Sequence, residues 1–215
     1  MMTLAQNYAQ IFKRDCFTFK QLKEQLSTEE IEQIKIEYKT VWQAWKELHL
    51  TIYSQFEKTF ERPNIESWTN GWNLRNHFWA AYRLKDAPKS NACLGVLINR
   101  KQLQIYLMFQ HYKSEQRVGL ATDYNQLLQQ IPTWSQTVDC RHYQIWPQQE
   151  HELDDHLPLS TYLNTPVLQE QLEKEIIDTS FQLGKVYYHD VPTEEIEQVI
   201  TKALRELLPL LQACK

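Results

Sequence analysis

A regular stripe of apolar residues between positions 31 and 52 is the strongest constraint on the fold. Its members recur at alternating steps of three and four residues: Ile31, Ile34, Tyr38, Val41, Trp45, Leu48 and Ile52. This spacing places them all on one face of an α-helix. Ser27 and Glu30 form a capping-box sequence just before the stripe, and Pro63 disfavours helix in the residue before it. The sequence therefore predicts a long helix over residues 28–60.

The stripe has three interpretations. An apolar helix face normally packs against the protein's own core, and we expect that here. The regular spacing is also compatible with a homodimer seam through the 28–60 helix, although Tyr38 and Trp45 are bulky for a tight two-stranded seam. A membrane-surface helix is disfavoured because the outer face is acidic and mixed rather than basic.

Three strands are predicted in the middle of the chain, over residues 74–84, 92–98 and 102–112. Short links separate them, and consecutive strands with short links form an antiparallel meander rather than parallel units. A short helix is predicted over residues 122–131 and a fourth strand over residues 138–146. Residues 147–166 are polar and acidic and contain prolines, which is typical of a loop.

Two further helices are predicted in the last quarter of the chain, over residues 167–188 and 192–213. Asp190 is a suitable cap for the second of them, and Pro192 suits its first turn. The order of elements is that of an α+β protein. We therefore expect residues 1–215 to form a single α+β domain, with an antiparallel sheet of about four strands packed against three long helices.

Glycine and cysteine usage excludes several classes of site. The 215 residues include four glycines, no two closer than 24 residues: Gly71, Gly95, Gly119 and Gly184. No dinucleotide or P-loop motif is therefore present, since both need closely spaced glycines. The cysteines are also far apart in the sequence, which excludes a metal knuckle or redox pair by spacing: Cys16, Cys93, Cys140 and Cys214. The residues identify no cofactor and leave open whether the chain is an enzyme.

The location predicted from the sequence is cytoplasmic, without a membrane partner. The first residues lack the basic start and apolar run of a signal peptide, and no apolar stretch approaches the length of a membrane span. The net charge of −4 is distributed unevenly. Residues 71–118 carry 8 basic and 2 acidic side chains, whereas residues 119–215 carry 6 basic and 15 acidic ones. The middle segment is thus the candidate surface for an anionic partner.

Strand alternation gathers polar and aromatic side chains on one predicted sheet face. The first strand contributes Arg75, His77, Trp79 and Arg83, and the third contributes Gln104, Tyr106, Gln110 and Tyr112. Arginine binds phosphate or carboxylate, aromatic rings stack on planar groups, and amides read donors and acceptors. This pattern predicts recognition of an anionic planar ligand, a nucleotide or a nucleic acid. The simpler interpretation is a solvated face whose arginines pair with the acidic C-terminal helices.

The segment EHELDDH at residues 150–156 is the one cluster that resembles a metal site. His151, Asp155 and His156 are ligand types that suit zinc, manganese or iron, and Asp139 and His142 are candidates to complete the set. The alternative function is accordingly a metal-assisted hydrolase. The simpler interpretation is an acidic surface loop.

Three stretches carry a resemblance to a known family: FKRDCFTFKQLK at 12–23, GWNLRNHFWAAYRLK at 71–85 and QLQIYLMFQHYKSEQR at 102–117. Together they resemble a small family of uncharacterised bacterial proteins, some members of which are labelled glucose-6-phosphate 1-dehydrogenase. That label implies a nicotinamide cofactor, which ordinarily needs the closely spaced glycines that this chain lacks. The family has no established catalytic residues, so the resemblance assigns no role to any residue here.

Overall fold

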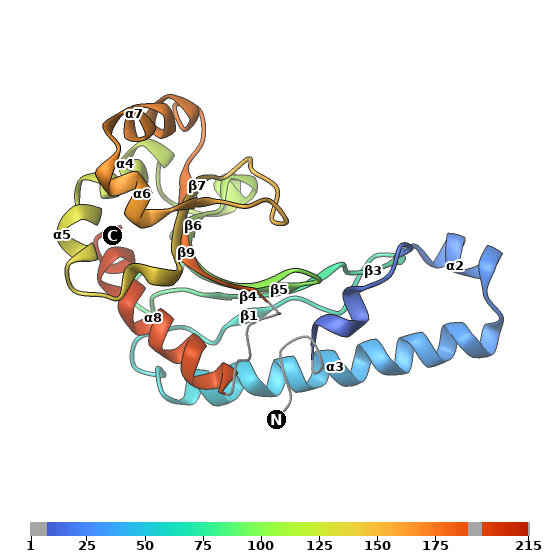
Figure 1. The fold of residues 1–215 in the computed structure, drawn as a ribbon. Helices are drawn as coiled ribbons and strands as arrows, with labels where there is room; N and C mark the ends of the chain where they lie inside the picture. Colours follow the sequence, from blue (N-terminus) through green and yellow to red (C-terminus); the bar gives the residue numbers. More distant parts are fainter. Residues whose placement is uncertain (1–7, 189–194, 215) are drawn as a thin grey trace.

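The computed structural model describes residues 8–188 and 195–214, with the side chains of 112–114 left out. The protein is α+β and is built on an antiparallel sheet of seven strands in the order β1-β4-β5-β6-β9-β7-β8 (Figure 1). The strands are β1 Asn64–Ile65, β4 His77–Tyr82, β5 Ala92–Asn99, β6 Gln102–Phe109, β7 Tyr143–Pro147, β8 Leu157–Pro158 and β9 Phe181–Tyr188. A separate small ribbon pairs β2 Thr69–Asn70 with β3 Asn73–Leu74.

Two of the described helices are long, in contrast to the three long helices predicted. The α-helices are α2 Phe19–Gln25, α3 Thr28–Ser54, α4 Ala121–Asn125, α5 Ile131–Ser135, α6 Leu159–Asn164, α7 Pro166–Glu175 and α8 Ile196–Gln212. Short 3-10 turns are η1 Ala9–Phe12, η2 His111–Gln116, η3 Gln126–Gln129 and η4 Cys140–His142. Over the described residues, no helix combines the length and the apolar character needed to cross a bilayer.

Helix α3 confirms the strongest sequence signal. The Ser27 hydroxyl accepts a hydrogen bond from the Glu30 backbone N–H, and the Glu30 carboxylate accepts one from the Ser27 N–H. The helix ends at Ser54 rather than near residue 60, because the chain then turns and packs Phe56 and Phe60 into the core beside Tyr82.

The apolar stripe of α3 faces the protein's own sheet. Ile31, Tyr38, Trp45 and Ile52 are buried, and the rings of Tyr38 and Trp45 contact Phe78 on β4. The face that would have formed a homodimer seam is therefore already covered within the chain.

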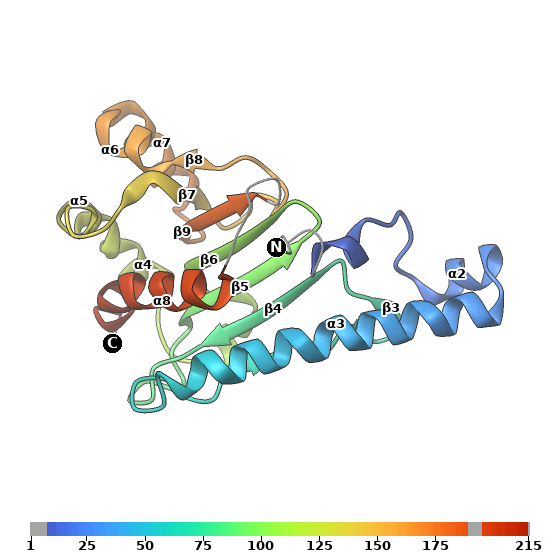
Figure 2. The same ribbon diagram turned by 60° about the horizontal axis from the view of Figure 1, so that its bottom comes forward.

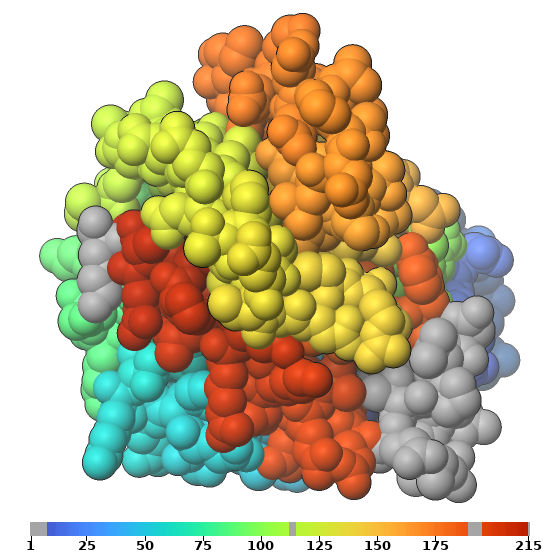
Figure 3. Space-filling model, turned by 60° about the vertical axis from the view of Figure 1, so that its left-hand side comes forward, coloured from blue at the N-terminus to red at the C-terminus, as the bar shows by residue number. Residues whose placement is uncertain are grey.

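Helices α3 and α8 cover the same face of the sheet (Figures 1 and 2). The apolar side of α8 packs on β5 and β6 and carries buried Ile200, Leu204, Leu207 and Leu211. The space-filling view shows the α5 region lying directly against α8 (Figure 3). The Trp134 indole of α5 donates a hydrogen bond to the Glu206 carbonyl of α8 over 2.7 Å. This face of the sheet is thus covered by helices and forms part of the hydrophobic core.

The helix predicted over residues 167–188 is wrong in its second half. Helix α7 ends at Glu175, and residues 181–188 form β9, which pairs with β6 on one side and β7 on the other. Residues 181–186 are all buried, so the strand shows no clear alternation of apolar and polar residues. Gly184 faces β6 so closely that a Cβ atom would collide with the Ile105 carbonyl oxygen. The glycine is therefore a packing requirement of a central strand.

Other boundaries differ from the sequence predictions. The first strand spans 77–82 rather than 74–84, and the third ends at Phe109 rather than residue 112. The helix predicted at 122–131 is divided among α4, η3 and α5, and the fourth strand begins only at Tyr143. The segment predicted as a loop at 147–166 contains β8 and α6. The capping roles predicted for Asp190 and Pro192 lie outside the described residues.

Candidate functional site

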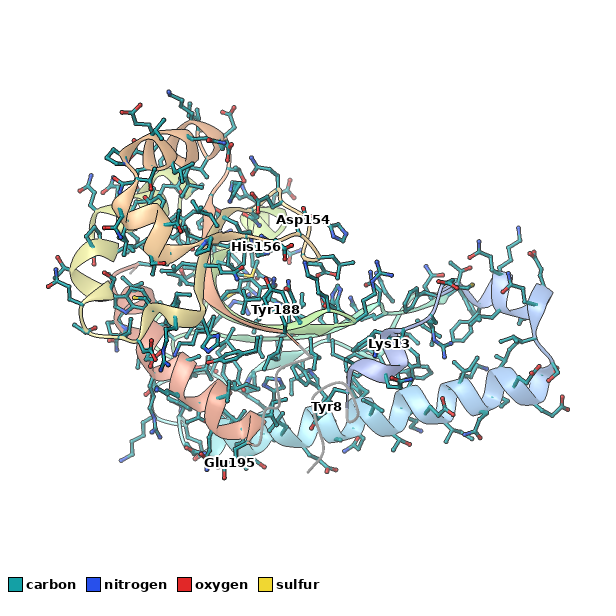
Figure 4. All side chains as sticks on the ribbon, viewed as in Figure 1. Tyr8, Lys13, Asp154, His156, Tyr188 and Glu195 are labelled. Atoms are coloured by element: carbon teal, nitrogen blue, oxygen red, sulfur yellow. The ribbon has the colours of Figure 1, made fainter. Side chains whose placement is uncertain are left out.

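Residues 148–156, which we call the bridging loop, lie over the sheet face opposite α3 and α8. We call this face the concave face; its apolar patch is formed by Trp79, Ala81, Cys93, Leu97, Tyr106, Met108, Trp146 and Val186. In Figure 4, Asp154 and His156 lie on the loop above the sheet, and Tyr188 lies below them on β9. The loop leaves β7, which lies next to the edge strand β8, and reaches back across the sheet, so it forms a roof over part of this face.

The tip of the bridging loop is fastened to the turn between β5 and β6. The Gln102 side chain donates to the Glu152 carbonyl over 2.6 Å, and Lys101 donates to the Leu153 carbonyl over 2.7 Å. Lys101 also pairs with Asp155 at 2.7 Å, and the Tyr188 hydroxyl donates to the same carboxylate. Two of these bonds end on backbone carbonyls, so the loop's path depends on strand residues more than on its own side chains.

His77 joins the bridging loop to the far side of the sheet. Its Nδ1 lies 3.0 Å from the Glu152 carboxylate, and both side chains are about one-fifth exposed, at 23% and 22%. His77 is on β4, and three strands, β5, β6 and β9, separate it from β7, where the loop begins. The imidazole is thus oriented by a carboxylate at a position that solvent still reaches.

His156 lies underneath the loop with its side chain fully buried. Its Nδ1 is 2.8 Å from the Glu150 carboxylate, its Nε2 is 3.2 Å from the Gln104 amide nitrogen, and its ring stacks on Trp146 at 4.1 Å. Burial lowers the pKa of His156, while the Glu150 carboxylate acts in the opposite direction. A neutral imidazole that donates from Nδ1 and accepts at Nε2 satisfies both contacts.

A cavity of about 400 Å³ lies between the bridging loop and the concave face. Its walls hold five amide side chains: Asn76, Gln104, Gln148, Gln149 and Gln182. Tyr106 and Trp146 add aromatic surface, and His77, His151, Glu150 and Glu152 add titratable groups. The volume lies within the range of small-molecule sites, and the walls are more polar than those of a typical one.

A second hollow of about 280 Å³ continues this cavity past the loop tip. The two share Asn76, His151 and Glu152, and the second adds Phe12 and Arg100 among its walls. Arg100 is exposed, and the salt bridges of the described residues do not include it. A positive charge is therefore available at one end of a cleft whose other end is amide-rich.

Part of the predicted ligand face is assembled. His77, Gln104 and Tyr106 line the cavity, and the Trp79 indole beside them donates to the Tyr106 hydroxyl over 3.1 Å. Strand alternation placed these four correctly, because β4 and β6 are both regular neighbours of β5.

The two predicted arginines do not reach the cavity. Arg75 lies before β4 begins, where alternation no longer applies, and it pairs with Glu66 at 2.7 Å. Arg83 lies beyond the other end of β4, where it is buried and donates to Gln110. The side chain of Tyr112 is outside the described residues. The prediction that this face is basic is therefore wrong: the cavity is aromatic, amide-rich and partly acidic.

The three predicted metal ligands have separate partners. His151 accepts from the Leu153 backbone N–H, Asp155 pairs with Lys101, and His156 is held by Glu150 and Gln104. Across residues 8–188 and 195–214, no three His, Cys, Asp or Glu side chains are close enough to hold a metal ion. Of the two side chains proposed to complete the set, Asp139 pairs with Arg141 and His142 packs on Tyr187. The predicted ligand set is therefore not assembled.

Sequence reasoning missed Asn76, Gln182 and the amides of the bridging loop. Gln182 was assigned to a helix, although its spacing from Gly184 and Val186 is that of one strand face. Gln148 and Gln149 precede the acidic cluster, and only the docking of the loop brings them to the sheet. Residues 181–188 offer no clear strand signal in the sequence, because residues 181–186 are all buried and do not alternate between apolar and polar.

Comparison with known proteins gives the family. A protein-family model matches residues 4–214, nearly the whole chain. The chain belongs to this family. A relative from Haemophilus influenzae, described as an uncharacterized protein, is 29% identical over 219 residues, which cover 100% of this chain and 99% of the relative. The family is thus a small one of uncharacterised bacterial proteins, as the three quoted stretches predicted. The glucose-6-phosphate dehydrogenase label stays untested.

Proposed function

We propose that the cavity beneath the bridging loop binds a small ligand with a planar polar ring and an anionic group, such as a mononucleotide. The observation that carries this proposal is the gathering of five amide side chains and two aromatic rings in one cavity. Amides present a donor and an acceptor side by side, which is the pattern that the edge of a nucleobase requires. Aromatic surface adds stacking with little dependence on the base.

Gln182 is the amide best placed to contact a ligand. It is nine-tenths buried at 9% exposure and lines the cavity, and its side chain makes no hydrogen bond to another described residue. Gln104, by contrast, is already engaged with His156. The Gln182 amide atoms are not among the enclosed polar atoms that lack a partner, so they are open to water or to a ligand. Gln182 is therefore the first residue to test for ring recognition.

The anionic group is assigned to the Arg100 end of the cleft. Glu152 lines both hollows, whereas Glu150 lines only the cavity beside the amides, so the cavity has one more carboxylate than the Arg100 end and is the less favourable place for a phosphate. Arg100 lies in the adjoining hollow and offers forked donors that match phosphate geometry. Because the bridging loop roofs the cavity, a mononucleotide fits this site better than a nucleic-acid duplex.

Calorimetric titration with a panel of nucleosides and their 5′-monophosphates tests the proposal. Replacement of Gln182 by Leu should weaken the best nucleoside and its monophosphate alike, by about tenfold for one lost buried hydrogen bond. Arg100→Gln should weaken the monophosphate alone. Arg75→Gln is the matched control, because Arg75 pairs with Glu66 outside the cavity. Absence of binding by the whole panel, or equal effects of Arg100→Gln and Arg75→Gln, would contradict the proposal.

A second candidate is hydrolysis of the same ligand class, and the His77–Glu152 pair favours it. A carboxylate 3.0 Å from Nδ1 orients the ring and leaves Nε2 as a base at the cavity wall. Chromatographic assay of bound nucleotides would show turnover that His77→Gln abolishes while binding persists. Unchanged nucleotides after prolonged incubation with the wild-type protein would leave recognition as the function.

A further inference from the structure

The cleft under the bridging loop has two chambers. We call the cavity of about 400 Å³ the amide cavity, and the adjoining hollow of about 280 Å³ the outer hollow. Leu153 of the bridging loop and Phe17 of the N-terminal segment both line the outer hollow. Figure 4 labels Asp154 and Lys13, which are direct chain neighbours of residues on the two sides of this hollow. Three wall residues are common to the two chambers, so the cleft is continuous.

The outer hollow differs from the amide cavity in the character of its surface. Its surface is more apolar than polar, whereas the surface of the amide cavity is slightly more polar than apolar. Phe12 is fully buried, so the open apolar surface comes from Phe17 and Leu153, which are half-buried. An aromatic ring that reaches the surface stacks on a base with little dependence on the identity of that base. The outer hollow therefore suits a second planar ring.

His151 lies where the two chambers meet, because it lines both of them. Its Nδ1 accepts a hydrogen bond from the Leu153 backbone N–H over 3.1 Å, so the proton of the neutral ring is on Nε2. The side chain is exposed, and its Nε2 makes no hydrogen bond within the part of the chain that the structure describes. An N–H donor is thus open to a ligand at the junction.

The charges at the junction are balanced between one carboxylate and two donors. Glu152 also lines both chambers, and its carboxylate is 3.0 Å from Nδ1 of His77. The His151 N–H and the Arg100 guanidinium are the donors on the side of the outer hollow. A diester phosphate carries a single negative charge, so it is repelled less by Glu152 than a terminal phosphate would be.

We propose that this cleft binds a dinucleotide, that is, two nucleosides joined by one phosphodiester. The inference rests on the proposed function and extends its ligand from one nucleoside to two. The first base lies in the amide cavity beside Gln182, and its nucleoside carries the phosphate on the 5′ oxygen. The phosphate lies between His151 and Arg100. The second base stacks on Phe17 and packs against Leu153.

Calorimetric titration of the full-length protein tests the second nucleoside. The probes are the dinucleoside monophosphates ApA, CpC, GpG and UpU. Each is compared with the methyl ester of the matching nucleoside 5′-monophosphate, which has the same diester charge but lacks the second nucleoside. The best dinucleotide should bind about tenfold more tightly than its methyl ester, which is the size of one added base–aromatic stack. A pentanucleotide that binds equally well would identify the unit as the end of a single strand, and weaker binding would identify a free dinucleotide.

Variants then locate the second base and the phosphate. Phe17→Leu should weaken the dinucleotide about fivefold and leave the methyl ester unchanged. Phe19→Leu is the matched control, because that ring is also half-buried but contacts Lys35 of α3 outside the cleft. His151→Ala should weaken the dinucleotide and the methyl ester alike, by about fivefold for one charge-assisted hydrogen bond, and should leave the free nucleoside unchanged.

The outcomes separate this inference from the function on which it rests. If the methyl esters bind and no dinucleotide binds more tightly, recognition of a single nucleotide stands and the second-base site is wrong. If neither class of probe binds, the proposed function itself fails. Equal effects of Phe17→Leu and Phe19→Leu would also overturn the inference. If Phe17→Leu does not fold, Leu153→Ala at the loop tip replaces it, with the same selective loss of dinucleotide affinity expected.

Discussion

At the scale of single residues, buried histidines have the most measurable consequences. His49 on α3 is fully buried, with its Nδ1 2.6 Å from the Tyr82 hydroxyl, and burial lowers the pKa of its imidazole to about 3. It is therefore neutral in the folded protein over the whole physiological range, whereas the unfolded chain protonates it near pH 6.5.

This difference predicts an acid-sensitive stability. Because the folded pKa is depressed, the stabilisation is complete above about pH 6.5 and is lost as the pH falls toward 3. Between pH 7 and pH 5 the free energy of unfolding should fall by about 2 kcal/mol from His49 alone. Urea titrations at several pH values measure the slope. His49→Gln should flatten it whatever its effect on absolute stability; an unchanged slope would show that other groups are responsible.

Gly184 gives a second prediction at this scale. A Cβ atom there would collide with the backbone of β6 at Ile105 and Tyr106, which cannot move without separating the strands. Gly184→Ala should lower the free energy of unfolding by about 3 kcal/mol. Gly95→Ala is the matched control in a buried strand: its nearest neighbours are the side-chain ends of Tyr106 and Trp79, and about 1 kcal/mol is expected. Guanidinium unfolding curves of both variants measure the two decreases in the free energy of unfolding. Equal decreases would contradict the packing argument.

At the scale of elements, α3 is held by the face that it turns to the sheet. Trp45 is fully buried and contacts His49 and Phe78 by ring packing. Ile36, on the same helix, is 58% exposed. Because Trp45 and Ile36 lie on the same helix but differ in burial, substitutions at the two positions distinguish the loss of core packing from a change in helix propensity.

Trp45→Ala should therefore destabilise the protein by about 3–5 kcal/mol, while Ile36→Ala should change stability by less than about 0.5 kcal/mol. Chemical denaturation followed by circular dichroism measures both. A Trp45→Glu variant should unfold rather than dissociate from a dimer into monomers, because the apolar stripe is buried against the sheet of the same chain. A folded, lower-mass Trp45→Glu species in size exclusion would instead revive the dimer seam.

At the scale of the whole molecule, contacts between distant segments join the N-terminal and C-terminal halves. Helix α8, near the C-terminus, packs on α3 and on β5 and β6, and β9 lies between β6 and β7. The buried Lys185 of β9 pairs with Glu206 of α8 at 2.6 Å, which adds a charged link to the apolar one. The larger apolar core draws its residues from both halves of the chain, from Phe12 to Leu211.

We therefore predict a single cooperative unfolding transition. Tryptophan fluorescence, which reports on residues spread from 42 to 146, should follow the same denaturant curve as far-ultraviolet circular dichroism. Two separated transitions, or a fragment of residues 1–120 that folds alone, would show that the chain is divided into domains.

The parts of the fold that the sequence predicted are those held by local rules. The capping box and stripe of α3 depend on residues within one helix, and the β4–β5–β6 meander depends on short links. His77, Trp79, Gln104 and Tyr106 were placed on one face because alternation within two strands suffices. Arg75 escaped this rule because the strand had not yet begun at its position.

The amino-acid sequence by itself determined the α+β class, the long helix and the aromatic strand face. Tertiary structure alone decided that residues 181–188 form a strand, since their partners on β6 are about 80 residues away and a strand buried on both faces loses its alternation. It also decided the site. The amides of residues 148 and 149 meet Gln104 and Gln182 only because Lys101 and Gln102 hold the bridging loop over the sheet. Contacts between segments so far apart in the chain leave no periodic trace in its sequence.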